Sequence, residues 1–186
     1  MRCCFINSDI NRLIKYVKQM KIKGIIRDLQ LSDADAICRI YNYYIKNTVI
    51  TFEEDVVSID IMRERIKKIL KKEYPYIIYE ENNRVLGYAY LNNWRDRSAF
   101  NITLETSIYI GHEYTGKGIG TLLYSKLIEK AKLLDIHSVI GCISLPNPNS
   151  QKLHERLNFK LVGNFKEAGK KNGKLIDVEF WQLTLN

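Results

Sequence analysis

Residues 105–121 read ETSIYIGHEYTGKGIGT, and this stretch decides the fold. β-forming residues alternate up to Ile110, four glycines follow at 111–120, and TLLYSKLIEKAKLL at 121–134 then has a helical pattern. A turn needs one or two glycines, so the loop is predicted to receive a group that approaches the backbone closely. The N–H groups of such a loop and the positive end of the following helix form an anion site, for which phosphate is the natural ligand.

Two common phosphate motifs do not fit this loop. Gly116-Lys117 lacks the upstream glycine of the P-loop and is followed by Gly118. The spacing G-x-G-x-G also falls short of the dinucleotide fingerprint, and no β-α-β unit surrounds it. The loop alone therefore leaves two interpretations open, an anion site and a flexible helix start.

The pattern on both sides of the loop predicts an α+β domain. The expected order is one strand, two helices, a meander of three strands, a helix, a strand, a short helix and two strands. The predicted strands cover 24–29, 76–91 (a hairpin with the tip ENNR), 102–110, 137–143, 159–165 and 176–185. The predicted helices begin at Ser32, with Asp35 completing a capping box, at Ser58, near residue 118 and at 151. Helices inserted asymmetrically among strands favour a mixed, mostly antiparallel sheet over a doubly wound one.

The length of 186 residues suits one domain, and 46% apolar with 27% charged residues excludes a disordered chain. The net charge is +8, but residues 1–24 hold six Lys and Arg against one Asp and so carry +5 of it. We therefore predict a basic helical appendage at 1–24, ahead of the domain at 25–186. The basic run at 63–73 is interpreted as the solvated face of a helix, and no nucleic-acid partner is expected.

The cysteines at 3, 4, 38 and 142 form no C-x-x-C pair, and no histidine has zinc-ligand spacing. A reduced, cytoplasmic protein without a metal is therefore predicted. Nowhere do about 18 apolar residues run together, so no membrane association is expected either. Cys142 lies in an apolar strand and is predicted to be a small buried residue.

A second motif follows at 146–159, PNPNSQKLHERLNF. Together with the loop it resembles the GNAT acetyltransferases, whose CoA loop is Q/R-x-x-G-x-G/A and whose next motif is N-x-x-A/S-x-x-L-Y/H-x-x-x-G/N-F. Gly118, Gly120, Asn147, Ser150 and His154 fall on these positions, and Phe159 completes the second motif. Thr115 stands where the family has Gln or Arg, with Lys117 as a substitute cation.

WRDRSAFNITLETSIYI, LPNPNSQKLHERLNF and AGKKNGKLIDVEFWQ also resemble the branch of phosphinothricin and methionine-sulfoximine N-acetyltransferases, over about residues 25–185. The resemblance implies the GNAT fold, acetyl-CoA as co-substrate, a small amino-acid-like amine as acceptor, and a homodimer with the C-terminal strand EFWQLTL as one candidate edge. Two alternatives stay open: another acceptor (a protein N-terminus, a polyamine or an aminoglycoside), and a non-enzymatic CoA-sensing or nucleic-acid-binding module.

The resemblance assigns residues to the CoA site. The predicted contacts are Ile108, Tyr109, Ile110, Thr115, Gly116, Lys117, Gly118, Ile119, Gly120, Thr121, Asn147 and Ser150. The amides at 108–110 are also expected to stabilise the oxyanion that forms on the thioester carbonyl.

An amine attacks a thioester only as its free base, so a carboxylate must take its proton. Glu105 is the predicted base, with a solvated strand carboxylate as the alternative. His154 stands where many relatives have a tyrosine acid and is predicted either to protonate the leaving thiolate or to be a packed residue that contacts CoA.

For the acceptor, the resemblance points to Arg95, Arg97, Ala99 and Phe100, because a guanidinium can hold an oxyanion with two hydrogen bonds. Solvated loop arginines are the alternative. Phe52 is a predicted apolar wall. Leu175 replaces the tryptophan usual in this branch, which leaves the acceptor's identity open.

Overall fold

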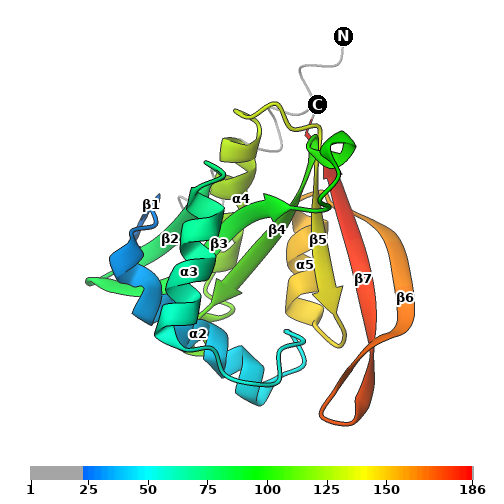
Figure 1. The fold of residues 1–186 in the computed structure, drawn as a ribbon, viewed down its shortest axis with the longest axis horizontal. Helices are drawn as coiled ribbons and strands as arrows, with labels where there is room; N and C mark the ends of the chain where they lie inside the picture. Colours follow the sequence, from blue (N-terminus) through cyan, green and yellow to red (C-terminus); the bar gives the residue numbers. More distant parts are fainter. Residues whose placement is uncertain (1–22, 186) are drawn as a thin grey trace.

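The computed structural model describes residues 23–185 as one sheet with helices on both faces (Figure 1). Residues 1–22 of the basic helical appendage predicted at 1–24 lie outside the described residues. Of the predicted appendage only residues 23–24 are described, and the Gly24 N–H donates to the Tyr79 hydroxyl at 2.9 Å. The division of the chain at residue 24 therefore stays a prediction.

The helices and strands follow the predicted order. They are β1 (Ile25–Asp28), α2 (Ala34–Asn47), α3 (Ile59–Leu70), β2 (Tyr76–Glu81), β3 (Arg84–Asn93), β4 (Thr103–Ile110), α4 (Ile119–Ala131), β5 (Ser138–Ser144), α5 (Pro148–Arg156), β6 (Lys160–Lys171) and β7 (Lys174–Thr184). Short 3-10 turns lie at Leu31–Asp33, Ser98–Phe100 and His112–Tyr114.

The seven strands lie in the order β1-β2-β3-β4-β5-β7-β6. Neighbouring strands are antiparallel except β4 and β5, which run parallel. The predicted α+β class with a mixed, mostly antiparallel sheet is confirmed.

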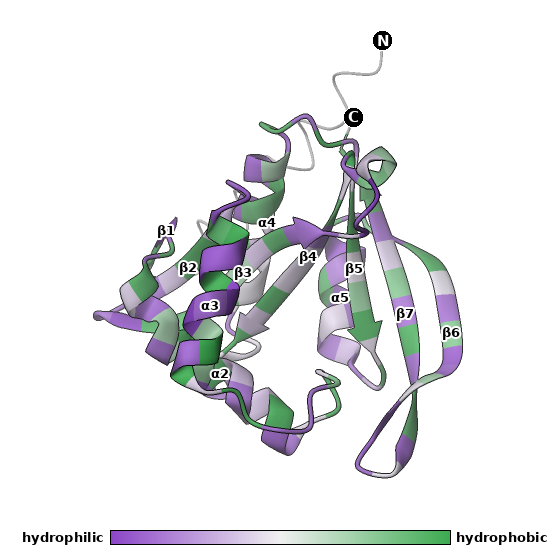
Figure 2. Ribbon diagram, viewed as in Figure 1, coloured by the Kyte–Doolittle hydropathy of each residue, from purple (hydrophilic) through white to green (hydrophobic). Residues whose placement is uncertain are grey.

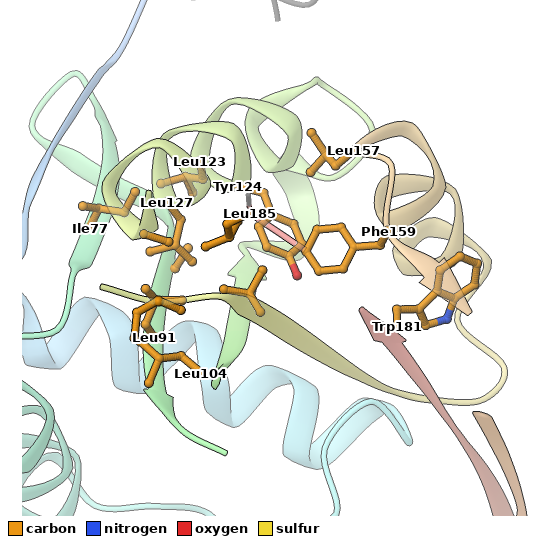
Figure 3. Close-up of a cluster of buried hydrophobic side chains, with 14 of the residues drawn as sticks. Ile77, Leu91, Leu104, Leu123, Tyr124, Leu127, Leu157, Phe159, Trp181 and Leu185 are labelled. Atoms are coloured by element: carbon orange, nitrogen blue, oxygen red, sulfur yellow. The ribbon is translucent and has the colours of Figure 1, made fainter. Parts of the chain in front are cut away.

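Side chains of β2 and β3 alternate between two apolar cores. Ile77 and Leu91 pack under α4, whereas Ile78 and Tyr88 pack under α2 and α3. Figure 3 shows the first core between α4 and the sheet, with Tyr124 in its centre. Because both faces are covered, this half of the sheet is rigid and buried, and it fixes the position of β4.

Three details differ from the sequence prediction. Asp33, rather than Asp35, accepts the backbone N–H at the start of the α2 region, from Gln30 at 2.8 Å. The last two strands form one long hairpin around Asn172 and Gly173, both with positive φ (50° and 75°), and Figure 2 shows hydrophobic and hydrophilic bands alternating along it. The segment EFWQLTL at 179–185 lies between β5 and β6, so β6 is the edge strand and the predicted dimer edge is wrong.

Candidate active site

The sheet is split between β4 and β5. Within the described chain the two strands pair only from Thr103–Ser138 to Thr106–Gly141, although β4 continues to Ile110 and β5 to Ser144. The Gly111 N–H donates to Leu86 in β3 at 2.8 Å. Since N–H groups alternate in direction along a strand, those of Ile110 and Ile108 point away from β3, into the gap. The Tyr109 amide points toward β3, so of the three predicted amides two face the gap.

The glycine loop leads into an uncapped helix beside this gap. Gly116 and Gly118 have φ of 73° and 85°, a region that favours glycine, and α4 begins at Ile119. Within residues 23–185 no side chain caps this N-terminus, and the first turn has no acidic residue. Its free N–H groups and the positive end of the helix dipole suit an anion, and the anion site at this loop stays a prediction.

Other predicted residues of the loop have defined positions. Lys117 is exposed, with Nζ 5.0 Å from the ring centre of Tyr114. The Thr115 hydroxyl donates to the His112 carbonyl at 2.9 Å, so its proton is directed into the loop and away from a ligand. Sequence reasoning missed Arg156, whose Nη1 lies 3.4 Å from the Thr121 hydroxyl and adds a cation next to the first turn of α4. Its position two residues after His154 in a short helix was the available signal.

A cavity of about 200 Å³ passes through the gap. Glu105, Ser107 and Tyr109 line it from the face of α2 and α3, and Tyr124 and His154 line it from the opposite face. The segment Ile50, Thr51 and Phe52 also lines it, and the rest of the wall consists of Thr106, Ile108, Gly141, Cys142, Ile143, Ser144, Asn147 and Ser150. The structure thus brings Phe52, Glu105, Ile108, Tyr109, Asn147, Ser150 and His154 of the predicted set into one site.

The predicted arginine block does not line this cavity. Arg97, Ala99 and Phe100 are exposed in the segment between β3 and β4, where Phe100 packs edge-on against Trp94 at 5.2 Å. Arg95 lies over the Trp94 ring at 5.0 Å, and its charge still acts on Glu105.

Glu105 is the carboxyl group at the cavity wall. Burial raises the pKa of its carboxyl, and the Arg95 charge partly opposes this rise. A carboxylate with a raised pKa is a stronger base than an exposed one, and Glu105 lies on the same face of the sheet as Ser107 and Tyr90, which pair across β3 and β4. The position therefore suits proton abstraction.

His154 is buried and hydrogen-bonded on both ring nitrogens. Nδ1 lies 2.8 Å from the Ser150 carbonyl, and Nε2 lies 3.0 Å from the Tyr124 hydroxyl. Burial lowers the pKa of His154 to about 4, although the Ser150 carbonyl raises it slightly. The ring is therefore neutral near pH 7, with its proton on Nδ1 facing a carbonyl and Nε2 accepting from Tyr124. This geometry favours the packed role of His154 over that of proton donor.

Tyr124 was not singled out in the sequence. Its hydroxyl also lies 2.5 Å from the Thr106 hydroxyl, so a chain of hydrogen bonds joins β4, α4 and α5. Gly141 leaves room for the imidazole of His154 in this chain of hydrogen bonds, because a Cβ at position 141 would lie 2.1 Å from His154 Nε2. The sequence feature that could have indicated this role of Tyr124 is a single tyrosine among the leucines on the apolar face of the helix.

The remaining polar wall comes from β5 and α5. Asn147 caps α5 through Oδ1, which accepts the Ser150 N–H at 3.2 Å. The Ser144 hydroxyl is buried and has no hydrogen-bond partner among residues 23–185. Cys142 is exposed, so its predicted burial is wrong; its side chain borders the cavity because it alternates with Gly141 and Ile143. Desolvation within the cavity and the Glu105 charge raise the pKa of its thiol to about 11.

The part of the chain that the structure describes holds no group of three or more His, Cys, Asp or Glu side chains arranged for a metal ion. None of its helices is long and apolar enough to span a membrane.

A sheet that splits between two parallel strands, next to a glycine-rich helix start, defines the class of acyl-CoA N-acyltransferase folds. A family model described as the acetyltransferase (GNAT) domain matches residues 26–180. The chain therefore belongs to the GNAT acetyltransferase family.

Several relatives are similar over nearly the whole chain. Phosphinothricin N-acetyltransferase of Streptomyces viridochromogenes is 32% identical over 157 residues, 84% of this chain and 85% of the relative. L-methionine sulfoximine/L-methionine sulfone acetyltransferase of Pseudomonas aeruginosa is 33% identical over 162 residues, 87% of this chain and 94% of the relative. The crystal structure of a phosphinothricin acetyltransferase from Sinorhizobium meliloti, in complex with acetyl-CoA, superposes with a TM-score of 0.85 at 36% identity, covering 88% of this chain and 89% of that one.

Proposed function

We propose that this protein transfers the acetyl group of acetyl-CoA to the amino group of a small amino-acid-like acceptor of the phosphinothricin, methionine sulfoximine or methionine sulfone type. One observation carries the proposal: a cavity crosses the sheet at its split, with a half-buried carboxylate on one face and the anion site beside it. The names of the relatives and the acetyl-CoA bound to the Sinorhizobium enzyme support the same reaction class.

The donor site consists of the loop and the start of α4. The amides from Gly116 to Thr121 suit the diphosphate of acetyl-CoA, and Lys117 and Arg156 add positive charge there. Ile108 and Ile110 offer amides along the gap, where they suit the pantetheine chain and the oxyanion of the thioester carbonyl. The thioester brings an activated acetyl group, so no metal is needed for the reaction.

Glu105 acts as the general base in this proposal. Its carboxylate accepts a proton from the acceptor ammonium, directly or through one water, and the freed nitrogen pair forms the amide bond while the carbon–sulfur bond breaks. Both substrates are bound together, and no covalent enzyme intermediate is required.

Tyr124 and His154 lie on the leaving-group side. The single proton of His154 faces the Ser150 carbonyl, and His154 Nε2 accepts the hydrogen bond of the Tyr124 hydroxyl, so Tyr124 can protonate the leaving group only if this hydroxyl turns from His154 toward the cavity. We therefore assign His154 the role of orienting Tyr124. The thiolate leaves as the thiol after gaining a proton from this side or from the attacking nitrogen.

The cavity favours a small acceptor. A volume of about 200 Å³ is below the usual range for ligand pockets, which argues against a bulky acceptor such as an aminoglycoside within the same walls. Phe52 supplies an apolar wall, and the unpaired Ser144 hydroxyl is available to a polar substituent. Arg95 does not line the cavity, so its role toward the acceptor's anionic group stays a prediction, as do the roles of Arg97, Ala99 and Phe100.

A CoA-release assay across a panel of amines tests the function. We expect the wild type to turn over amines of the phosphinothricin and methionine sulfoximine type. We expect Glu105→Gln to lower kcat by a factor of about 10²–10⁴. The exposed Glu113→Gln is the matched control, expected to keep full activity. If calorimetry detects no CoA binding, the proposal is lost, and high turnover of a polyamine or peptide would replace the acceptor class.

We also propose a homodimer that uses the edge strand β6. Leu161, Val162 and Phe165 are exposed there, with relative exposures of 49%, 55% and 58%. An open edge with apolar side chains favours pairing with a second copy. Light scattering of the wild type and of Val162→Lys tests this, and a wild-type monomer at all concentrations would refute it. The cytoplasmic location stays a prediction.

A further inference from the structure

Part of the cavity wall is a segment of the connection between α2 and α3. We call Val49–Glu54 the acceptor strap. Ile50, Thr51 and Phe52 of this strap line the cavity that also contains Glu105. The strap has no regular secondary structure, so its position depends on side-chain contacts. Tyr41 of α2 provides one, with its hydroxyl 2.9 Å from Thr51 Oγ1.

The second contact comes from a residue 120 positions further along the chain. Lys171, at the tip of the β6–β7 hairpin, donates from Nζ to the Thr51 carbonyl at 2.7 Å. Its side chain is fully buried, at 0% exposure, between the strap and the hairpin. Figure 1 shows the connection after α2 (cyan) extending from the helix toward β5, on the side where the hairpin tip (orange to red) projects from the sheet.

A fully buried ammonium is costly unless it is paired and hydrogen-bonded. Burial lowers the pKa of Lys171, and the Glu54 and Glu53 carboxylates of the strap partly oppose this. A hydrophobic residue would fill the same volume without that cost. The ammonium therefore serves a geometric purpose: its hydrogen bond holds one backbone carbonyl of the strap.

The third contact is made by Phe52, whose ring lies directly on the backbone of Gly169. A Cβ at Gly169 would lie 2.2 Å from Phe52 Cε1 and 2.6 Å from Cζ. Only glycine at position 169 allows the ring to lie this close to the backbone. Lys171 and Gly169 thus hold adjacent residues of the strap, Thr51 by a hydrogen bond and Phe52 by ring packing.

We propose that Lys171 is a positioning residue for the acceptor: it fixes Thr51 and Phe52 at the acceptor end of the cavity and thereby sets the affinity for the amine. This inference rests on the proposed function for the identity of the ligand. The residue touches neither the glycine loop nor the gap, so it acts on the acceptor and leaves acetyl-CoA binding unchanged. The Asn172–Gly173 turn places it at this point, because it ends β6 opposite Lys174.

The test compares Lys171→Met with Lys170→Met. Methionine keeps most of the lysine stem and removes the ammonium, and Lys170 is the adjacent, exposed lysine on the same strand. Steady-state kinetics is measured with the best amine of the panel, and hydrogen exchange is followed at the amides of residues 49–54 without substrates. A hydrogen bond to a charged group corresponds to roughly a tenfold change or more in an equilibrium constant.

We expect Lys171→Met to raise the KM for the amine about tenfold and to speed exchange of the strap about tenfold. The KM for acetyl-CoA stays within twofold, and Lys170→Met changes none of these quantities. Gly169→Ala acts on the same strap without altering charge, so it is expected to raise the amine KM as well, and it decides the question if Lys171→Met does not fold.

The inference is overturned if Lys171→Met and Gly169→Ala leave the amine KM and the strap exchange as in Lys170→Met, or if the KM values of both substrates rise together. If the wild type acetylates no amine of the panel, the proposed function fails instead. In that case hydrogen exchange at the strap amides alone decides whether Lys171 holds Thr51. Exchange that is unchanged in Lys171→Met would refute this role.

Discussion

His154 makes the stability of this protein depend on pH in a defined direction. Histidine ordinarily has a pKa of 6.5, and burial lowers that of His154 to about 4. Between these values the unfolded chain binds a proton that the folded chain excludes. The free energy of unfolding therefore falls as the pH falls through this window, and the loss is complete below the folded pKa.

The size of the effect follows from the pKa difference. One pKa unit corresponds to about 1.36 kcal/mol, so the full loss between pH 6.5 and 4 is about 3 kcal/mol. About 2 kcal/mol of this is lost between pH 7 and pH 5, where most exposed carboxylates are still ionised. Glu105 changes the free energy of unfolding with pH in the opposite direction. Its pKa is raised, so protonation at low pH removes the cost of burying its charge. A comparison of variants is therefore needed to isolate His154.

Urea unfolding at pH 7, 6 and 5, followed by the fluorescence of the buried Trp181, measures the slope. We expect His154→Gln, whose side chain does not titrate, to be less stable than the wild type at pH 7 but to lose about 2 kcal/mol less on going to pH 5. His137→Gln, which removes an exposed histidine, is the control and should follow the wild-type slope. Equal slopes for His154→Gln and the wild type, or an NMR titration of His154 in the folded protein near pH 6.5, would refute a neutral, buried imidazole.

Three further outcomes are expected. Gly118→Ala forces a Cβ into a backbone with φ of 85°, so we expect the affinity for CoA, measured by calorimetry, to fall about tenfold. Gly163 has open space around it, so Gly163→Ala should leave the affinity for CoA unchanged. Equal CoA affinities for the two variants would argue against the loop as the anion site. Tyr124→Phe leaves the His154 nitrogen buried without its donor and should cost about 1–3 kcal/mol of unfolding free energy at pH 7, so a loss below about 0.5 kcal/mol would contradict the hydrogen-bond chain. Because the pKa of the Cys142 thiol is raised to about 11, we expect it to react with iodoacetamide at pH 7.5 roughly a hundredfold more slowly than a free cysteine. Peptide mass spectrometry follows the alkylation, and rapid alkylation of Cys142 would refute the raised pKa.

Local signals in the sequence were sufficient for the order of the helices and strands and for the glycine loop that precedes α4. Alternating apolar residues, the Ser58 cap and the glycines at 116 and 118 each act within a few residues, and the Ser58 hydroxyl indeed accepts the Ile61 N–H at 3.2 Å. The hairpin turn at Asn172-Gly173 had such a signal as well, since Asn-Gly is the preferred pair for a two-residue turn. Its strands were predicted too short because polar residues occupy both faces near the tip.

Contacts between distant segments carry no such signal. The split between β4 and β5 depends on where a parallel pairing ends, and Tyr124 gains its role only when α4 brings it to Thr106 and His154. The hydrogen bond from Lys171 to Thr51 joins residues 120 positions apart. A lysine in a basic, polar segment reads as a solvated side chain, and only tertiary packing makes it the most buried charge of the described chain.

The chemistry of the site depends on the register of a single strand. Successive side chains of β4 point to opposite faces, so Glu105 lies toward α2 and α3, whereas Thr106 lies toward Tyr124 and the neutral His154. Seven residue pairs with β3, from Gly87–Ile110 to Asn93–Leu104, fix this register. A shift by one residue would place the carboxylate in the apolar core under α4 and would remove the proposed general base from the cavity. The gap beyond Thr106 connects the two faces of the sheet, as the proposed attack of an amine on a thioester from the opposite face requires.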